Sequence, residues 1–315
     1  MLPPAASLTG APFAHIMGGT SPLRRPPQPK EEATMHRKVR IITDSASDMT
    51  AVRPELTVLP MTVTFGSDDY LDGVTLSHAD FYAKLVESDV LPTTSQLSPF
   101  AFEQAFRAAL DAGEDPLAVT LSSRLSGTYQ SALFAANACG APVPVVDSET
   151  VCVGERILIE YALRLLDEGL DAAAIAAALE QRKRDIRLIA LLDTLEYLMR
   201  GGRISRTVGF VGGVLSIKPV IAIEGGEIAV LGRARGSRNS NNLLSEQVRQ
   251  CGGIDFSMPF ALGYTGASDT LLQKYVHDSA ALWQDQTDAL PVHTVGGTIG
   301  THAGPGAIAV AFFHR

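Results

Sequence analysis

The segment VRIITDSAS, residues 39–47, introduces the pattern that decides the fold: a short aliphatic run that ends in Asp and Ser. From this segment onward, aliphatic runs of strand length alternate with longer segments of helical period, which is typical of α/β proteins. The predicted strands are 39–43, 56–65, 117–121, 142–146, 187–192, 219–223, 227–232, 258–264 and 306–313. The predicted helices begin near residues 79, 99, 126, 154 and 171. We therefore predict an α/β protein with two domains, 37–186 and 187–315.

Local signals support the predicted helix ends. Ser98 is a good N-cap followed by Pro99 at the first helical position, and Gly113 and Gly140 are plausible stops. The opening motif also has an echo, because PVVDSET at 144–150 again runs from a strand into Asp and Ser. Two interpretations stay open: both junctions are helix caps, or both line one crevice at the carboxyl ends of parallel strands.

Composition and charge exclude several classes of protein. The chain has 315 residues, of which 46% are hydrophobic but only 6% aromatic, so aliphatic side chains must form most of the core. The net charge of −8 argues against a general nucleic-acid binder. The three cysteines, Cys139, Cys152 and Cys251, form no C-x-x-C pair and predict buried thiols in a reducing cytoplasm rather than disulfides or a zinc site.

The N-terminal 36 residues differ from the body of the chain. They are rich in Pro and Gly and lack the compact apolar core of a signal peptide, so we expect a disordered tail. Met35 stands just before the first strand, so an upstream misplaced start codon would explain the tail. The sequence has no apolar run long enough to span a membrane, and we expect a cytoplasmic protein.

Common enzyme signatures are absent from the sequence. It contains no G-x-x-x-x-G-K-[ST], no H-E-x-x-H and no G-x-S-x-G. Gly304, Gly306 and Ala309 fit a dinucleotide-binding pattern, but too few residues follow for the helix, strand and acidic residue that this pattern requires.

Three polar, turn-rich segments stand out against the aliphatic background: 91–99, 121–132 and 297–307. Ser126 lies at a predicted helix start, where it either caps the helix or helps to hold an anion. His302 lies between glycines, so we expect it in a tight loop, where it is either solvated or available to a carboxylate. The stretch 200–238 is locally basic, which suits either simple solvation or a phosphorylated ligand or acidic partner.

Taken in order, these segments resemble the DegV family of bacterial lipid-binding proteins. The matching segments are IITDSASDMT from 41, LPMTVTFGSDDYLDGVTLS from 59, FYAKLVES from 81, LPTTSQLSP from 91, LSSRLSGTYQSA from 121, VVDSET from 145, LDTLEYLMRGGRIS from 192, IKPVI from 217 and GTHAGPGAIAVAF from 300. The resemblance implies a mostly parallel N-terminal sheet and a mixed second α/β domain, with a tunnel between them that holds one long-chain fatty acid such as palmitate or stearate.

The resemblance also implies roles for particular residues. The carboxyl group of the fatty acid would be held by Thr94, Ser126 and His302; Arg203 would lie near the head group, and Arg235 would contact a kinase. Leu97 and Ala303 depart from the family's usual Pro and Thr, and neither change removes a donor to the head group.

The family's members are non-catalytic carriers, so the resemblance implies no cofactor and no catalytic residue. The expected partners are an ATP-dependent fatty acid kinase, which makes acyl phosphate, and transiently a membrane surface. Physical chemistry agrees, because burying roughly fifteen methylenes at about 0.8 kcal/mol each contributes about 12 kcal/mol before ordering costs.

Two rival functions come from other classes of protein. The first is a hydrolase of lipid esters with Ser126 as nucleophile, His302 as base and Asp44 or Asp147 as the group that orients the imidazole. The second is a regulator that binds protein or DNA through the basic stretch 200–238.

Overall fold

The computed structural model describes residues 37–50, 53–205, 207 and 217–315. Their strands are β1 Val39–Asp44, β2 Leu56–Leu59, β3 Thr62–Phe65, β4 Asp68–Leu71, β5 Thr93–Ser95, β6 Asp115–Thr120, β7 Val145–Asp147, β8 Ile186–Leu191, β9 Ile217–Glu224, β10 Glu227–Arg235, β11 Phe260–Tyr264, β12 Val292–Thr294 and β13 Ile308–Phe313. Their α-helices are α1 His78–Glu87, α2 Pro99–Asp111, α3 Thr128–Ala138, α4 Cys152–Asp167, α5 Ala172–Arg182, α6 Glu196–Arg200, α8 Ser237–Gln250, α9 Thr270–Asp278, α10 Ala280–Trp283 and α11 Gly297–Ala303. The predicted tail, residues 1–36, lies outside the described residues.

Two large sheets carry the body of the protein. The first is entirely parallel, with strand order β2-β1-β6-β7, and the second is mixed, with order β10-β9-β8-β13-β11-β12. This confirms the predicted fold class of a parallel sheet followed by a mixed one. Ile186 begins β8, the first strand of the mixed sheet, whereas β1, β2, β6 and β7 of the parallel sheet all precede it in the sequence. The division into separate domains at that point stays a prediction.

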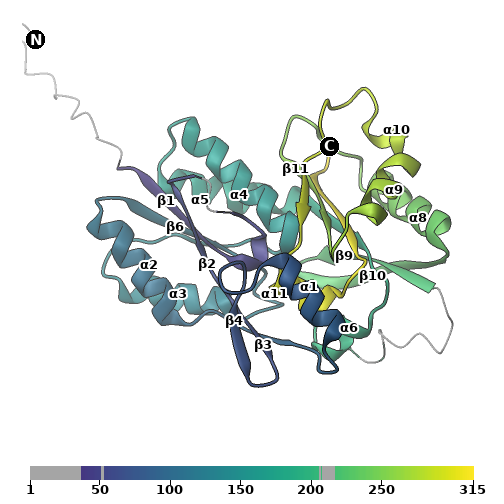
Figure 1. Ribbon diagram of the computed structural model, residues 1–315. Coiled ribbons are helices and arrows are strands. Elements are labelled where there is room, and N and C mark those ends of the chain that lie inside the picture. Colours follow the sequence, from purple (N-terminus) through teal and green to yellow (C-terminus); the bar gives the residue numbers. More distant parts are fainter. Residues whose placement is uncertain (1–36, 51–52, 206, 208–216) are drawn as a thin grey trace, which may run out of the picture. The chain divides into compact units, whose positions relative to one another are not determined.

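Helices cover the parallel sheet on both faces (Figure 1). Helices α2 and α3 lie on one face and α5 lies on the other, as the alternating strand and helix pattern requires. The Ser98 hydroxyl accepts the backbone N–H of Ala101 at 3.2 Å, and Pro99 occupies the first turn, so the predicted start of α2 is confirmed. Gly113 and Gly140 both have positive φ beyond the helix ends, as predicted for stops.

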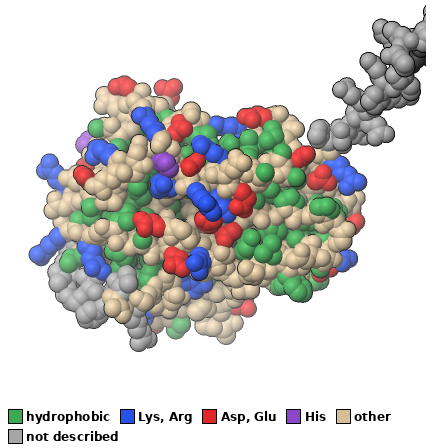
Figure 2. Space-filling view, turned by 180° about the vertical axis from the view of Figure 1, so that it is seen from behind, with side chains coloured by type: hydrophobic (Ala, Val, Ile, Leu, Met, Phe, Trp, Pro, Cys, Tyr) green, Lys and Arg blue, Asp and Glu red, His purple; other side chains and the backbone are tan. Residues whose placement is uncertain are grey.

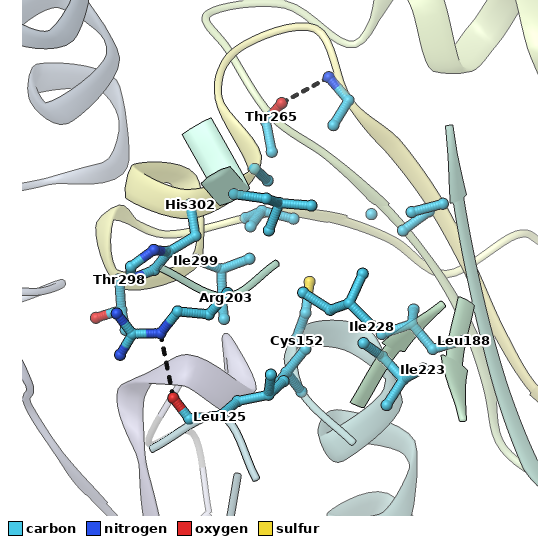
Figure 3. Close-up of a pocket in the computed structure, with 18 of the residues that line it drawn as sticks. Leu125, Cys152, Leu188, Arg203, Ile223, Ile228, Thr265, Thr298, Ile299 and His302 are labelled. Atoms are coloured by element: carbon cyan, nitrogen blue, oxygen red, sulfur yellow. Dashed lines mark hydrogen bonds between the residues drawn. The ribbon is translucent and has the colours of Figure 1, made fainter. Parts of the chain in front are cut away.

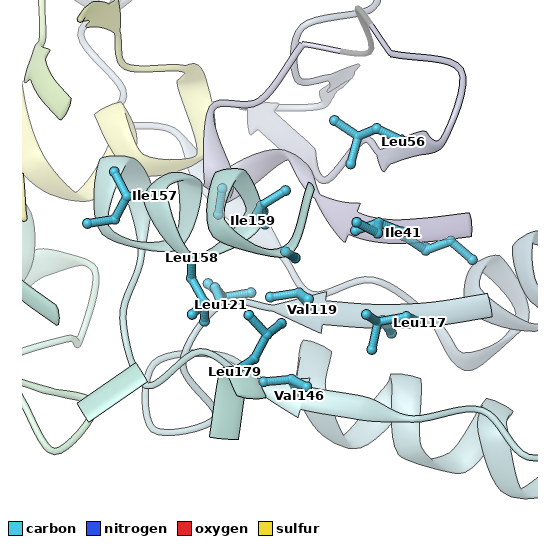
Figure 4. Packing of buried hydrophobic residues seen from close by; sticks show 14 of the residues in the cluster. Ile41, Leu56, Leu117, Val119, Leu121, Val146, Ile157, Leu158, Ile159 and Leu179 are labelled. Carbon is cyan, nitrogen blue, oxygen red and sulfur yellow. The ribbon is translucent and has the colours of Figure 1, made fainter. Parts of the chain in front are cut away.

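Helix α4 joins the two sheets into one core. It packs against β8, β11 and β13 of the mixed sheet and against α5. Its buried side chains include Ile157, Leu158 and Ile159, which belong to the same apolar cluster as Ile41 and Leu117 of the parallel sheet (Figure 4). Because the helix is apolar on most of its surface, it is buried on most of its surface.

A third, three-stranded sheet, with order β4-β3-β5, differs from the prediction. The predicted strand 56–65 is two strands in two sheets, β2 and β3, with Pro60 between them. Strand β5 is short and polar, and it was not predicted because only its pairing with β3 makes it a strand. Its register places Thr94 opposite Val63.

Candidate functional site

A largely apolar cavity lies against one face of the mixed sheet, at the carboxyl-terminal edge of the parallel sheet. It contains about 920 Å³ of atom-free space, including solvent at its mouth. Aliphatic side chains from β8, β9, β10 and β13 line it, together with Leu121 and Leu125 from the segment after β6. This position follows the rule that open α/β sheets bind ligands beyond the carboxyl ends of their strands.

One end of the cavity is polar and the other is apolar (Figure 3). His302 and Arg203 lie together at one side, whereas Leu188, Ile223 and Ile228 lie at the opposite side. The aliphatic bias of the composition is thus used in part to line a cavity rather than to fill a core.

All four residues that the resemblance places at the head group line this cavity. They are Thr94, Ser126, Arg203 and His302. Thr94 and His302 are in direct contact, because the Thr94 Oγ1 atom lies 2.9 Å from the His302 Nε2 atom. The structure therefore brings together residues that are 208 positions apart in the sequence.

His302 lies in the last turn of α11, not in the tight loop that the flanking glycines predicted. The turn comes at Gly304, whose φ is 70° and whose Cα faces the Tyr197 ring at a distance too short for any side chain. Sequence favoured a loop because glycine is a poor helix former.

Burial keeps the His302 imidazole neutral. Desolvation, and then the positive charge of Arg203, lower the pKa of His302 to about 4. Its Nδ1 atom has no hydrogen-bond partner among the described residues, so we place the proton on Nε2, because a bare acceptor is less costly to bury than an N–H. The Nε2–H then donates to Thr94 Oγ1, which leaves the Thr94 hydroxyl hydrogen free to donate to a ligand.

Gly201 fixes the other side of the imidazole. A methyl group at residue 201 would overlap His302 Nδ1. Gly201 has φ −71°, so it is needed here for the close approach rather than for its backbone conformation.

Ser126 is positioned by a segment that two aspartates hold. The Asp44 carboxylate accepts the backbone N–H of Leu121 at 3.0 Å, and the Asp147 carboxylate accepts that of Ser123 at 3.1 Å. Both also accept a backbone N–H within their own junction, from Ala46 and Glu149. Asp44 thus caps the short 3-10 helix Ser45–Ser47, as the first interpretation had it, whereas Asp147 caps no helix, because the N-cap of α4 is Val151. Neither aspartate lines the cavity.

The helix beside Ser126 begins two residues later than predicted. Helix α3 starts at Thr128 with Gly127 at its N-cap, and Gly127 makes no side-chain cap. The Ser126 hydroxyl accepts the N–H of Thr128 at 3.3 Å and lies 2.9 Å from the Thr128 hydroxyl. Capping and lining the cavity are therefore compatible roles for Ser126.

Arg203 places a positive charge at the polar end of the cavity. Its guanidinium donates to the carbonyl oxygens of Leu125 at 3.2 Å and Gly201 at 2.7 Å. No carboxylate of the described residues forms an ion pair with it, and burial lowers its pKa. A half-buried cation held by carbonyls is suited to an anionic ligand.

Arg235 lies away from the cavity. It is exposed at the end of β10, an edge strand of the mixed sheet, and does not line the site. Elsewhere in the basic stretch 200–238, Arg200 pairs with Glu196 at 2.5 Å and Lys218 with Asp193 at 2.6 Å. Arg206 lies outside the described residues.

Positive and negative side chains are interspersed on the face seen in Figure 2. Together with the ion pairs of Arg200 and Lys218, this mixing gives no support to a nucleic-acid surface. No helix of the described residues is long and apolar enough to cross a membrane.

The structure also adds residues that sequence reasoning missed. Gln96, Cys152, Tyr264 and Thr298 line the cavity. The Gln96 carboxamide lies over Gly127, where no side chain would fit, and it donates to Ser131 at 3.3 Å. Only its position next to the Thr94 motif could have indicated Gln96, and Cys152 gave no signal beyond its apolar neighbours.

The hydrolase hypothesis finds no support in this geometry. Its orienting carboxylate should contact His302 Nδ1, but that atom has no hydrogen-bond partner among the residues described. The Asp44 and Asp147 carboxylates accept backbone N–H groups instead. His302 Nε2 pairs with Thr94, and Ser126 pairs with Thr128.

Fold and cavity together define a class of protein: an α/β ligand-binding protein with an apolar cavity that ends in hydroxyl, imidazole and guanidinium groups. Within this class, the chain belongs to the DegV family, whose family model, described as "Uncharacterised protein, DegV family", matches residues 38–315.

Relatives agree with this membership over most of their lengths. A DegV domain-containing protein of Caldanaerobacter subterraneus subsp. tengcongensis is 33% identical over 285 residues, which are 87% of this chain and 98% of the relative. A solved DegV family protein from Thermus thermophilus, described by its fatty acid binding, is 30% identical with a TM-score of 0.78 and covers 88% of this chain and 99% of its own.

A third similar structure shares the fold at lower identity. The Streptococcus pneumoniae Fatty Acid Kinase B3 protein, loaded with linoleic acid, is 21% identical with a TM-score of 0.77 and covers 88% of this chain and 100% of its own.

Proposed function

We propose that this protein is a non-catalytic carrier that binds one long-chain fatty acid, such as palmitate or stearate, in the cavity. The observation that carries the proposal is the polar end of an otherwise apolar cavity, where Thr94, Ser126, His302 and Arg203 converge. The fatty acid binding described for the Thermus thermophilus relative supports it.

The carboxylate would lie at this polar end and the acyl chain along the aliphatic wall. The Thr94 and Ser126 hydroxyls would donate to the carboxylate, and Arg203 would balance its charge. His302 would orient the Thr94 hydroxyl through the 2.9 Å contact, and its Nε2–H would be shared between Thr94 and the carboxylate. Hydrogen bonds to a charged group contribute about 1.5 to 3 kcal/mol each, which is enough to compensate for desolvation of the carboxylate.

Native mass spectrometry of the purified protein tests ligand binding. We expect an added mass that corresponds to a long-chain fatty acid, and removal of lipid followed by addition of palmitate should restore it. A protein that carries no fatty acid and takes up none when it is offered would overturn the proposal. Ester turnover that disappears in Ser126→Ala would favour the hydrolase instead.

Substitutions at the polar end test the head-group assignment. We expect Thr94→Val and Ser126→Ala each to weaken palmitate binding by about tenfold or more. Thr93→Val is the matched control for the strand, because Thr93 precedes Thr94, is exposed and does not line the cavity. Ser123→Ala is the matched control for the segment after β6. Equal losses in variants and controls would contradict the assignment.

We further propose that the protein presents the carboxyl group to a separate ATP-dependent kinase, which forms the acyl phosphate. The support for this step is the likeness of its sequence motifs to carriers of this kind and the name of the pneumococcal neighbour. With kinase and ATP present, Arg235→Ala should reduce acyl phosphate formation without changing fatty acid affinity. Arg249→Ala, at the far end of α8, is the control. Equal rates of acyl phosphate formation in wild type, Arg235→Ala and Arg249→Ala would show that Arg235 does not contact the kinase.

A further inference from the structure

The helix that carries His302 is held at its N-terminus by two buried carboxylates from the first third of the chain. The Asp48 Oδ1 atom accepts the N–H of Gly296 at 2.7 Å. The Asp72 Oδ1 and Oδ2 atoms accept those of Gly297 at 2.8 Å and Thr298 at 3.0 Å. Three donors that a helix start leaves unpaired are thereby satisfied from outside the helix.

Helix α11 depends on this support because its own sequence is unfavourable. It has seven residues, GTIGTHA, and its N-cap Gly296 provides no side-chain cap. Short helices that contain glycine are unstable in isolation. The carboxyl oxygens supply the hydrogen-bond acceptors that the N-terminus of this helix lacks.

Asp72 is itself fixed in place. Its carboxyl is 3% exposed, and the Ser45 hydroxyl donates to its Oδ2 atom at 3.2 Å. The Ser45 oxygen in turn accepts the N–H of Met61 at 3.1 Å. The support for α11 therefore extends to Ser45, directly after β1, and to Met61, directly before β3.

Helix α11 also packs closely against α1 through its glycines. A side chain at Gly300 would lie 2.6 Å from the Phe81 ring and 2.7 Å from the Tyr82 hydroxyl. The Tyr82 hydroxyl also donates to the carbonyl of Val295 at 2.9 Å, just before the helix. This close packing on α1 adds to the support that the two aspartates provide.

We propose that Asp72, assisted by Asp48, is a positioning residue for recognition of the carboxyl group. Asp72 does not itself line the cavity, but it fixes the helix whose residues Thr298, Ile299 and His302 do. A shift of the helix start moves the imidazole away from Thr94. This inference rests on the proposed function, because it assigns Asp72 a part in binding the same carboxylate.

The test compares palmitate with hexadecanol, which has the same chain length but no carboxylate. Its measure is the ratio of the two affinities, since a general loosening of the protein would weaken both ligands alike. Asp72→Asn keeps the size of the side chain but turns an N–H toward a backbone N–H. We expect this ratio to fall by about tenfold or more in Asp72→Asn and in His302→Ala. The double variant should lose little beyond either single one.

Two further variants keep the test decisive. Asp171→Asn is the matched control, because Asp171 caps α5 through the N–H of Ala174 at 2.8 Å, far from the site in sequence and outside the cavity lining, and the ratio should not change. Ser45→Ala removes the hydroxyl that donates to Asp72, which also accepts the Met61 N–H and lies 3.4 Å from the Thr298 hydroxyl. It should lower the ratio by about fivefold even if Asp72→Asn does not fold.

The outcomes separate this inference from the proposed function. Wild-type protein that binds palmitate and hexadecanol equally would overturn carboxylate recognition itself. A wild-type preference that is lost in His302→Ala but kept in Asp72→Asn and Ser45→Ala would overturn the positioning role alone. Equal weakening of both ligands in these two variants would also overturn it.

Discussion

At the scale of single residues, the polar end of the cavity depends on side chains that are absent as much as on those that are present. Gly201 leaves the space that His302 Nδ1 occupies, and Gly304 leaves the space for Tyr197. A binding motif of this kind is therefore specified partly by glycines that never touch the ligand.

The variant Gly201→Ala tests whether the space beside His302 is needed for fatty acid binding. The added methyl group overlaps the His302 ring, so the ring must turn away from Thr94. We expect palmitate affinity to fall by about tenfold, measured by isothermal titration calorimetry with delipidated protein. Retained affinity would mean that α6 moves aside instead. Thr93→Val, at an exposed position outside the cavity lining, is the comparison.

The neutral state of His302 makes stability depend on pH. Its pKa is about 4 in the folded protein, below the ordinary value of 6.5, so the unfolded chain binds the proton first as the pH falls. The contribution of His302 to the free energy of unfolding is complete above pH 6.5 and decreases toward pH 4. Urea denaturation gives the free energy of unfolding of wild type and of His302→Gln. The difference between these two free energies should decrease by up to about 3 kcal/mol as the pH falls from 6.5 to 4. A difference that does not vary with pH would contradict a neutral buried imidazole.

At the scale of elements, the helix starts differ in what specifies them. Helix α2 has its own cap, Ser98, and Pro99, so its start could be predicted from sequence alone. Helix α11 has no cap of its own, and Asp48 and Asp72 provide it from more than 200 positions away. The glycines that flank His302 predict a loop, and no local signal in the sequence indicates the cap that the fold supplies.

Ser98→Ala is the test for the locally specified helix. It removes the hydroxyl that accepts the Ala101 N–H at an exposed position, so we expect a loss of about 1 kcal/mol in the free energy of unfolding. Urea denaturation measures it, and fatty acid affinity should stay unchanged because Ser98 does not line the cavity. Ser98→Asp, which preserves the cap, should recover most of the loss.

The strands, like the helices, differ in whether their own sequence or the surrounding fold specifies them. The strands β1, β6 and β8 follow from buried aliphatic runs. The edge strand β5 carries Thr94 but is polar, and only its pairing with β3 makes it a strand. The residues of the polar end were therefore identified from motifs, whereas the contact between Thr94 and His302 required the fold.

At the scale of the whole molecule, the cavity implies that ligand and stability are linked. A ligand that binds only the folded state raises stability by RT ln(1 + [L]/Kd), or about 2.7 kcal/mol at one hundred times Kd. We expect delipidated protein to melt several degrees below protein saturated with palmitate, as measured by differential scanning calorimetry. Hexadecane carries no carboxylate and should stabilise the protein much less. Identical melting temperatures would mean that the cavity stays empty.

The position of β13 in the middle of the mixed sheet affects how the protein folds. It lies between β8 and β11, and its register sets Ile308 opposite Leu191 from a distant part of the chain. Bringing these strands together closes a long loop, and the entropy lost in closing it is compensated only after the strands have paired. We therefore expect slow folding. Until β13 is inserted, the aliphatic residues that later face the cavity remain exposed. That late step is where a refolding chain is most prone to aggregate.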